Sequence, residues 1–173
     1  AKLHSPVISY DDKLTLEHYN LVSEILGDIL PVRLTGVNTF YSVTWDNISC
    51  YRGVSNLLMD LADRPEFMHR IVRMLTDFQL DTFNQYETLG LLDTDNYLLH
   101  CTPGLASDLP EKDGGVTRKD IWGRGAAQIF ASVSPSMHDE FDIDYMIETV
   151  GQCGLSYYGC CEPLDTKIDI VKR

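Results

Sequence analysis

Three side chains able to do chemistry stand close together near the carboxyl end of the sequence. Tyr158, Cys160 and Glu162 alternate with Gly159 and Cys161. Alternate residues of a β-strand point to the same side, so a phenol, a thiol and a carboxylate are expected side by side. A thiolate and a carboxylate are workable ligands for zinc. We therefore take Tyr158 and Glu162 as candidate catalytic residues and Cys160 as a candidate metal ligand.

A structural interpretation of the same segment stays open. Free cysteines usually behave as small buried apolar residues. The adjacent pair Cys160-Cys161 lacks the spacing of a structural zinc site, and a catalytic zinc normally takes three protein ligands. The residues alone do not choose between packing and chemistry.

A second group of candidates could bind substrate. Ser134-Pro135-Ser136 predicts the start of a helix that has His138 in its first turn, and Ser132 lies just before it. Helix starts attract anions, although Ser134 equally fits the role of an N-cap. Tyr41 follows a predicted strand and either lines a pocket or packs under a loop. The candidate substrate-binding residues are Ser132, Tyr41, Ser134 and His138.

Hydrophobic periodicity predicts the elements that must position these groups. Helices are expected over residues 14–27, 54–63, 65–90, 134–150 and from 164 onward. Strands are expected over residues 31–37, 97–101, 127–133 and 155–160. Strands that alternate with helices imply a parallel sheet, and a closed (β/α)8 barrel takes about 250 residues. The sequence therefore predicts a single α/β domain over residues 1–173 that is the central part of a larger barrel, with its active site at the carboxyl ends of the strands.

Composition restricts the partners. The 173 residues include 14 Lys and Arg and 26 Asp and Glu, a net charge of −12, which disfavours nonspecific nucleic-acid binding and docking on anionic membranes. Five cysteines, an odd and modest number, favour a reducing cytoplasmic setting. The sequence has no apolar run near the ~18 residues of a membrane span and no secretion signal. A small-molecule substrate is the expected partner.

Several motifs resemble the uroporphyrinogen decarboxylase superfamily. Residues 52–61 and 64–69 are similar to its "G-x-x-x-L-L-x-x-L…x-P-E" helix pair, and Gln128-Ile129-Phe130-Ala131-Ser132 resembles its "Q-x-F-x-S" strand. Residues 134–141 and 157–164 are similar to a divergent branch known only as decarboxylase-like. The resemblance runs from about Val32 to the end of the chain.

The resemblance implies a (β/α)8 barrel and one of two activities. One is the cofactor-free decarboxylation of uroporphyrinogen in porphyrin biosynthesis, a lyase reaction in which Ser132, and approximately Tyr41, match substrate contacts. The other is methyl transfer between a corrinoid protein and a thiol such as coenzyme M, activated by zinc. There the family's H-x-C strand end matches Tyr158-Gly159-Cys160, which keeps the thiolate, replaces the imidazole by a phenol, and leaves Glu162 as a substitute ligand.

The chain has few arginines, and most fall on predicted helices, whereas a decarboxylase must hold many substrate carboxylates. We therefore expect a methyltransferase, with zinc as cofactor and the corrinoid carried by a partner protein. Decarboxylation without a cofactor is the alternative. A third alternative is an inactive fragment that forms a homo-oligomer, because open parallel strand edges are adhesive.

Overall fold

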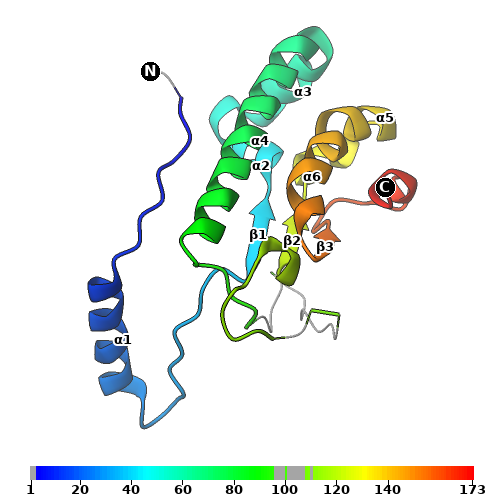
Figure 1. Cartoon of the computed structure of the whole chain (residues 1–173). Coiled ribbons are helices and arrows are strands. Elements are labelled where there is room, and N and C mark those ends of the chain that lie inside the picture. Colours follow the sequence, from blue (N-terminus) through cyan, green and yellow to red (C-terminus); the bar gives the residue numbers. More distant parts are fainter. Residues whose placement is uncertain (1–2, 96–99, 101–107, 110) are drawn as a thin grey trace.

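The computed structural model describes residues 3–95, 100, 108–109 and 111–173. Figure 1 shows a body of helices around a small sheet, and a first helix, α1 (Asp12–Leu26), that stands apart from it. Within the described residues, no helix combines the length and the apolar character needed to cross a membrane.

The sheet consists of three short parallel strands in the order β1-β2-β3. They are β1 (Thr39–Ser42), β2 (Trp122–Gly125) and β3 (Leu155–Tyr158). Their register is even: Ser42 lies opposite Gly125, and Gly125 lies opposite Tyr158. All three strands therefore end at one edge. This confirms a mixed α/β fold with parallel strands, while the described residues form an open sheet and not a closed barrel.

One face of the sheet packs against helices, and we call it the helix face. Phe40 of β1 stacks on Phe83, with ring centroids 4.0 Å apart. In β2 this face is made by glycines, since a Cβ on Gly123 would lie 2.7 Å from Val150 Cγ1, and one on Gly125 would lie 2.7 Å from Met146 Sδ. The missing side chains let the helical segment lie directly on the sheet.

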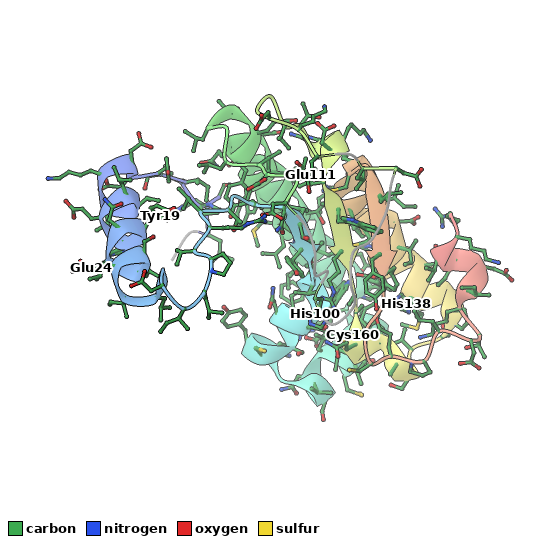
Figure 2. All side chains as sticks on the ribbon, turned by 90° about the horizontal axis from the view of Figure 1, so that it is seen from below. Tyr19, Glu24, His100, Glu111, His138 and Cys160 are labelled. Atoms are coloured by element: carbon green, nitrogen blue, oxygen red, sulfur yellow. The ribbon has the colours of Figure 1, made fainter. Side chains whose placement is uncertain are left out.

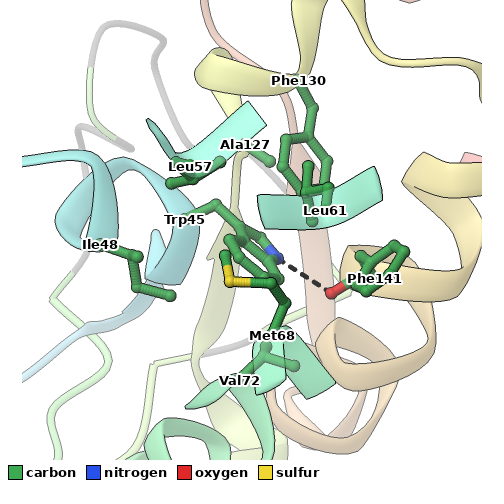
Figure 3. Close-up of a cluster of buried hydrophobic side chains, with 9 residues drawn as sticks. All are labelled: Trp45, Ile48, Leu57, Leu61, Met68, Val72, Ala127, Phe130 and Phe141. Atoms are coloured by element: carbon green, nitrogen blue, oxygen red, sulfur yellow. Dashed lines mark hydrogen bonds between the residues drawn. The ribbon is translucent and has the colours of Figure 1, made fainter. Parts of the chain in front are cut away.

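Three helices build the core beside β1. They are α2 (Thr44–Arg52), α3 (Val54–Asp63) and α4 (Pro65–Thr88), and the last two confirm the predicted boundaries. Trp45 is fully buried at their centre and its Nε1 donates a hydrogen bond to the Phe141 carbonyl at 2.9 Å (Figure 3). The buried cluster around it, drawn in Figure 3, comprises Trp45, Ile48, Leu57, Leu61, Met68, Val72, Ala127, Phe130 and Phe141.

A continuous helical segment follows β2 and covers the sheet. It runs through α5 (Pro135–His138), the π-helical turn η3 (Asp139–Ile143), α6 (Asp144–Thr149) and the 3-10 turn η4 (Val150–Gln152). Ser134 Oγ accepts a hydrogen bond from the Met137 N–H at 3.3 Å, so this helix starts where the sequence predicts. The remaining short elements are the 3-10 helices η1 (Arg118–Asp120) and η2 (Gln128–Ser132), and α7 (Ile168–Val171).

The helix predicted at residues 14–27 is confirmed, but α1 buries none of its residues. Its apolar side chains face solvent. The segment before α1 is attached to α4 through Gln85. The Gln85 Oε1 accepts a hydrogen bond from the Ile8 N–H at 2.7 Å, and the Gln85 Nε2 donates one to the Pro6 carbonyl at 2.9 Å. The periodicity of apolar residues predicted the helix correctly, but it does not predict which part of the protein, if any, packs against the apolar side.

Two predicted strands are wrong. Residues 31–37 form no strand, and only Val37 makes an isolated bridge, to Leu92. Residues 127–133 contain η2 in place of a strand, because the Asp46 carboxylate accepts from the N–H groups of Gln128 and Ile129 at 3.3 and 3.0 Å and holds them in a turn. The strand predicted at 155–160 is confirmed as far as Tyr158. The strand predicted at 97–101 lies, except for His100, outside the described residues.

Candidate functional site

The carboxyl edge of the sheet carries two polar groups, one on each face. On the helix face, Tyr158 meets His138 and Asp142. On the opposite face, which we call the arginine face, Tyr41, Arg124 and Tyr157 lie side by side on the three strands. Figure 2 places His138 and Cys160 in the sheet-and-helix body, well away from Tyr19 and Glu24 of α1. The two faces differ in how their polar atoms are satisfied.

Tyr158 is locked into the helix face. Its hydroxyl donates to Asp142 Oδ2 at 2.6 Å and lies 2.6 Å from His138 Nε2. Because the phenol has one proton and gives it to Asp142, His138 Nε2 must carry the hydrogen of the second bond. Burial, and then the negative charge of Asp142, raise the pKa of Tyr158 far above its ordinary value. This phenol is therefore a protonated structural group of the helix face.

Glu162 is occupied by the backbone. Its side chain is buried, with Oε1 accepting from the Ala127 N–H at 3.3 Å and Oε2 accepting from the Cys160 N–H at 2.9 Å. The carboxylate thereby ties the segment after β3 to the segment after β2. Both oxygens are engaged in holding the loops that surround the carboxyl edge.

Cys160 and Cys161 bring their sulfur atoms within 3.6 Å of each other. Cys160 is half-buried and Cys161 is exposed. The hydrogen bond with Cys161, and then burial, raise the pKa of Cys160, while the charge of Arg124 opposes this rise. Within the described residues, no three His, Cys, Asp or Glu side chains are placed to hold a metal ion. With Glu162 engaged by the backbone, the described residues do not complete the zinc site that the resemblance implies.

Arg124 is the site residue that sequence reasoning missed. It is only 3% exposed, yet its Nε and one terminal nitrogen are buried without any hydrogen-bond partner. Its Cζ lies 5.9 Å from the centroid of the Tyr41 ring. The available signal was an arginine between two glycines in Trp122-Gly123-Arg124-Gly125. Because the strand was predicted five residues later, at 127–133, Arg124 lay outside every predicted strand and helix.

The other predicted substrate-binding residues are dispersed. Tyr41 is 45% exposed and lies on the arginine face. His138 is fully buried behind the sheet, with Tyr158. Ser132 is exposed at the end of η2, and Ser134 caps the four-residue helix α5. The structure thus joins Tyr41 to Arg124 and His138 to Tyr158, and no described contact joins Ser132 or Ser134 to either group.

Two surface hollows have linings that contain none of the predicted site residues. One, of about 470 Å³, is lined by Arg33, Asp93, Thr94, Asp95, Glu111, Lys112 and Asp113. The other, of about 250 Å³, is lined by Ile48, Arg52, Asp60, Arg64, Phe67, Met68 and Ile71. In the second hollow, hydrogen bonds from Arg52 and Arg64 lower the pKa of Asp60 to about 2, so its charges already have partners.

Comparison with known proteins adds no identification: no family model, no curated protein and no solved structure matches this chain. The assignment of function therefore depends on the geometry above and on the motifs in the sequence.

Proposed function

We propose that this protein is a uroporphyrinogen decarboxylase-like enzyme that binds a small molecule bearing carboxylate groups at Arg124. The observation that carries the proposal is the buried guanidinium with two unpartnered nitrogens. Removing a cation from water costs several kcal/mol unless hydrogen bonds and opposite charge compensate it. A carboxylate ligand would supply both, because the guanidinium fork matches carboxylate geometry.

The surroundings of Arg124 support a binding role. The exposed ring of Tyr41 lies near the guanidinium, and Tyr157 occupies the matching position on β3. Aromatic rings stabilise a cation through their faces, and their hydroxyls are further hydrogen-bond donors. This arrangement suits an organic acid with an unsaturated or ring-shaped body, as a porphyrinogen has.

Arg124 fits best as an anchor for a carboxylate that stays on the substrate. In a decarboxylation the C–C bond breaks, its electron pair remains on the substrate carbon, which then takes up a proton, and the carboxylate departs as neutral CO2. A cation that held the departing carboxylate would favour the ground state and oppose its loss of charge. As an anchor, Arg124 binds ground state and transition state alike, so its removal should act mainly on KM.

Corrinoid-linked methyl transfer to a thiol is the second candidate. The observation that favours it is the half-exposed Cys160 thiol just beyond the end of β3. A thiol substrate with an anionic end, such as coenzyme M, would also use Arg124. A corrinoid protein would then be the partner. We derive no step through zinc, because the described ligand set is incomplete.

Self-association of an inactive fragment is the third candidate. In the described sheet, β1 and β3 are the outer strands, and outer strands present backbone groups to other chains. A homo-oligomer should appear in size-exclusion chromatography, and a clean monomer would contradict this candidate.

An activity assay of the full-length protein tests the proposal. Incubation with uroporphyrinogen should yield a less carboxylated product and CO2, whereas methylcobalamin with coenzyme M should yield the methylated thiol if the second candidate holds. Arg124→Met should raise KM by about tenfold to a hundredfold, the loss of one charge-assisted bidentate contact, and Arg124→Lys should raise it less. Arg70→Met, which removes an exposed arginine of α4, serves as the control. An unchanged KM in Arg124→Met would overturn the anchoring role.

A further inference from the structure

The pair Cys160-Cys161 differs from the other described cysteines. Its two sulfurs are 3.6 Å apart and one of them is exposed. Cys50 is exposed without a neighbouring cysteine, and burial raises the pKa of Cys153 to about 12, which makes that thiol inert. Two neighbouring thiols can lose two electrons by forming a disulfide with each other, which a single cysteine cannot do.

The backbone of the pair lies just outside the sheet. Gly159 ends β3 with a φ of 109°, a conformation that favours glycine. Residues 160–162 form bends outside any helix or strand, and Glu162 fixes the segment by its bond to the Cys160 N–H. To form a disulfide, the two sulfurs have to close from 3.6 Å to about 2.0 Å.

A disulfide between adjacent cysteines is strained. Neighbouring Cα atoms are about 3.8 Å apart, whereas ordinary disulfides join Cα atoms about 4.4–6.8 Å apart. Strained and exposed disulfides are easily reduced and are the labile ones. The pair is thus suited to reversible exchange and not to permanent cross-linking.

We infer that Cys160 and Cys161 form a two-electron dithiol centre that exchanges with disulfides of small anionic thiols. The exposed Cys161 thiolate attacks one sulfur of the disulfide, forms a mixed disulfide and releases the first thiolate. The Cys160 thiolate then attacks the Cys161 sulfur, forms the Cys160–Cys161 bond and releases the second thiolate. The protein loses two protons and two electrons, and the small disulfide is reduced to two thiols.

The order of the two steps follows from the contact between the sulfurs. Cys161 is the exposed thiol, and the Cys160 S–H can donate to its sulfur and stabilise the attacking thiolate. Cys160 is half-buried, so a disulfide in solution reaches Cys161 first. This assigns Cys161 as the attacking residue and Cys160 as the resolving residue.

The preference for an anionic partner comes from Arg124. Gly159, next to Cys160, donates to the carbonyl of Gly125, next to Arg124, at 2.9 Å, and two nitrogens of Arg124 have no hydrogen-bond partner. A localised positive charge raises the encounter rate of anions. The exchange is a chemistry separate from the proposed decarboxylation, and its readout does not require that activity.

Mass spectrometry of the reduced full-length protein tests the inference, with oxidised glutathione as the anionic disulfide and hydroxyethyl disulfide as the neutral one. Cys101, which lies outside the described residues, is replaced by Ser in every form. The parent should lose two hydrogens and release two glutathiones, and its peptide map should show Cys160 joined to Cys161. Cys160→Ser should stop with one glutathione on Cys161, and Cys50→Ser should behave as the parent. Arg124→Met should slow the reaction with oxidised glutathione about tenfold and leave that with the neutral disulfide unchanged.

Three results would overturn the inference. The parent could retain both thiols while Cys50 reacts, it could stop at a mixed disulfide, or its new disulfide could join other cysteines. If Arg124→Met slows the reactions with the anionic and the neutral disulfide equally, the inferred preference for anionic disulfides is wrong. Intact near-UV circular dichroism of each variant separates these results from misfolding.

Discussion

The two faces of the small sheet differ in how their buried polar side chains are hydrogen-bonded. On the helix face, the half-buried Tyr158 hydrogen-bonds to the buried His138 and Asp142, and one buried atom, His138 Nδ1, is left without a partner. On the arginine face, Arg124 is buried to nearly the same degree and leaves two nitrogens without partners. Tyr158 on β3 lies opposite Gly125, the residue that follows Arg124 on β2, so the two groups are close in the sheet but on opposite faces. The hydrogen bonds of Tyr158 stabilise the fold, whereas the burial of Arg124 lowers the free energy of unfolding.

This difference indicates where a ligand belongs. A network of hydrogen-bonded side chains specifies how elements pack, and removing one member leaves its neighbours unpaired. An unpaired buried cation lowers stability unless something else compensates it. Variants on the two faces should therefore change stability with opposite signs.

The largest expected effect is on the helix face. Asp142→Ala removes the acceptor of the Tyr158 hydroxyl, and the free energy of unfolding should fall by about 3 kcal/mol, as for a charged buried hydrogen bond. Denaturant unfolding measures it. Asp144→Ala, which removes an exposed partner of Arg173, should cost less than about 1 kcal/mol. Equal losses of unfolding free energy in the two variants would show that the helix-face hydrogen bonds contribute no more than a surface ion pair.

The next effect probes the close approach of helix and sheet. Gly123→Ala places a Cβ 2.7 Å from Val150 Cγ1 and 2.8 Å from the Val150 carbonyl oxygen, and overpacking of this kind costs about 1–3 kcal/mol. Gly151→Ala is the matched control, because its Cβ would meet Ile147 Cγ2 at 3.6 Å, an ordinary contact. Thermal unfolding of both variants gives the comparison. Retained stability in Gly123→Ala would mean that the helical segment lies further from β2.

How far the sequence predicts this fold depends on the length of each element. The helices at Val54–Asp63 and Pro65–Thr88 carry long apolar stripes and a proline at the second start, so periodicity was sufficient. β2 is four residues, Trp-Gly-Arg-Gly, with no β-branched side chain. Its pairing comes from neighbours far away in the chain, which local propensity does not contain. The apolar run after it instead resembled a strand.

An error in the extent of a strand also explains why the candidate residues at 158–162 were predicted to lie side by side. Alternation along the segment 158–162 was applied as if the strand continued, but β3 ends at Tyr158 and the chain then bends. Tyr158 therefore lies on the helix face, and Glu162 turns back to the backbone. Arg124 was missed because its burial follows from the register of β2 between β1 and β3, which the Gly-Arg-Gly pattern alone does not reveal.

A smaller effect concerns pH and the helix face. The pKa of Tyr158 is raised in the folded state, whereas an unfolded tyrosine ionises near pH 10. The stabilisation from the protonated phenol is thus complete below about pH 10 and is lost above it, by about 1.4 kcal/mol per pH unit. Unfolding of the parent and of Tyr158→Phe between pH 7 and 11 checks this. The gap between them should narrow above pH 10, and a constant gap would contradict the assignment.

The smallest expected change in stability, and the one of opposite sign, is on the arginine face. Arg124→Met removes an unpaired buried charge and keeps much of the apolar stem, so the free energy of unfolding should stay within about 1 kcal/mol of the parent or rise. Arg118→Met is the matched control: Arg118 binds Glu87 at 2.7 Å and lies over the Phe83 ring, and its loss should lower stability by about 1–2 kcal/mol.

A ligand reverses the order of these two arginine variants. An anion that binds only the folded protein raises stability by RT ln(1 + [L]/Kd). Small carboxylates added during thermal unfolding should therefore stabilise the parent and Arg118→Met, but not Arg124→Met. If carboxylates stabilise Arg124→Met as much as the parent, the unpaired guanidinium is not where they bind, and the contrast between the two faces concerns packing alone.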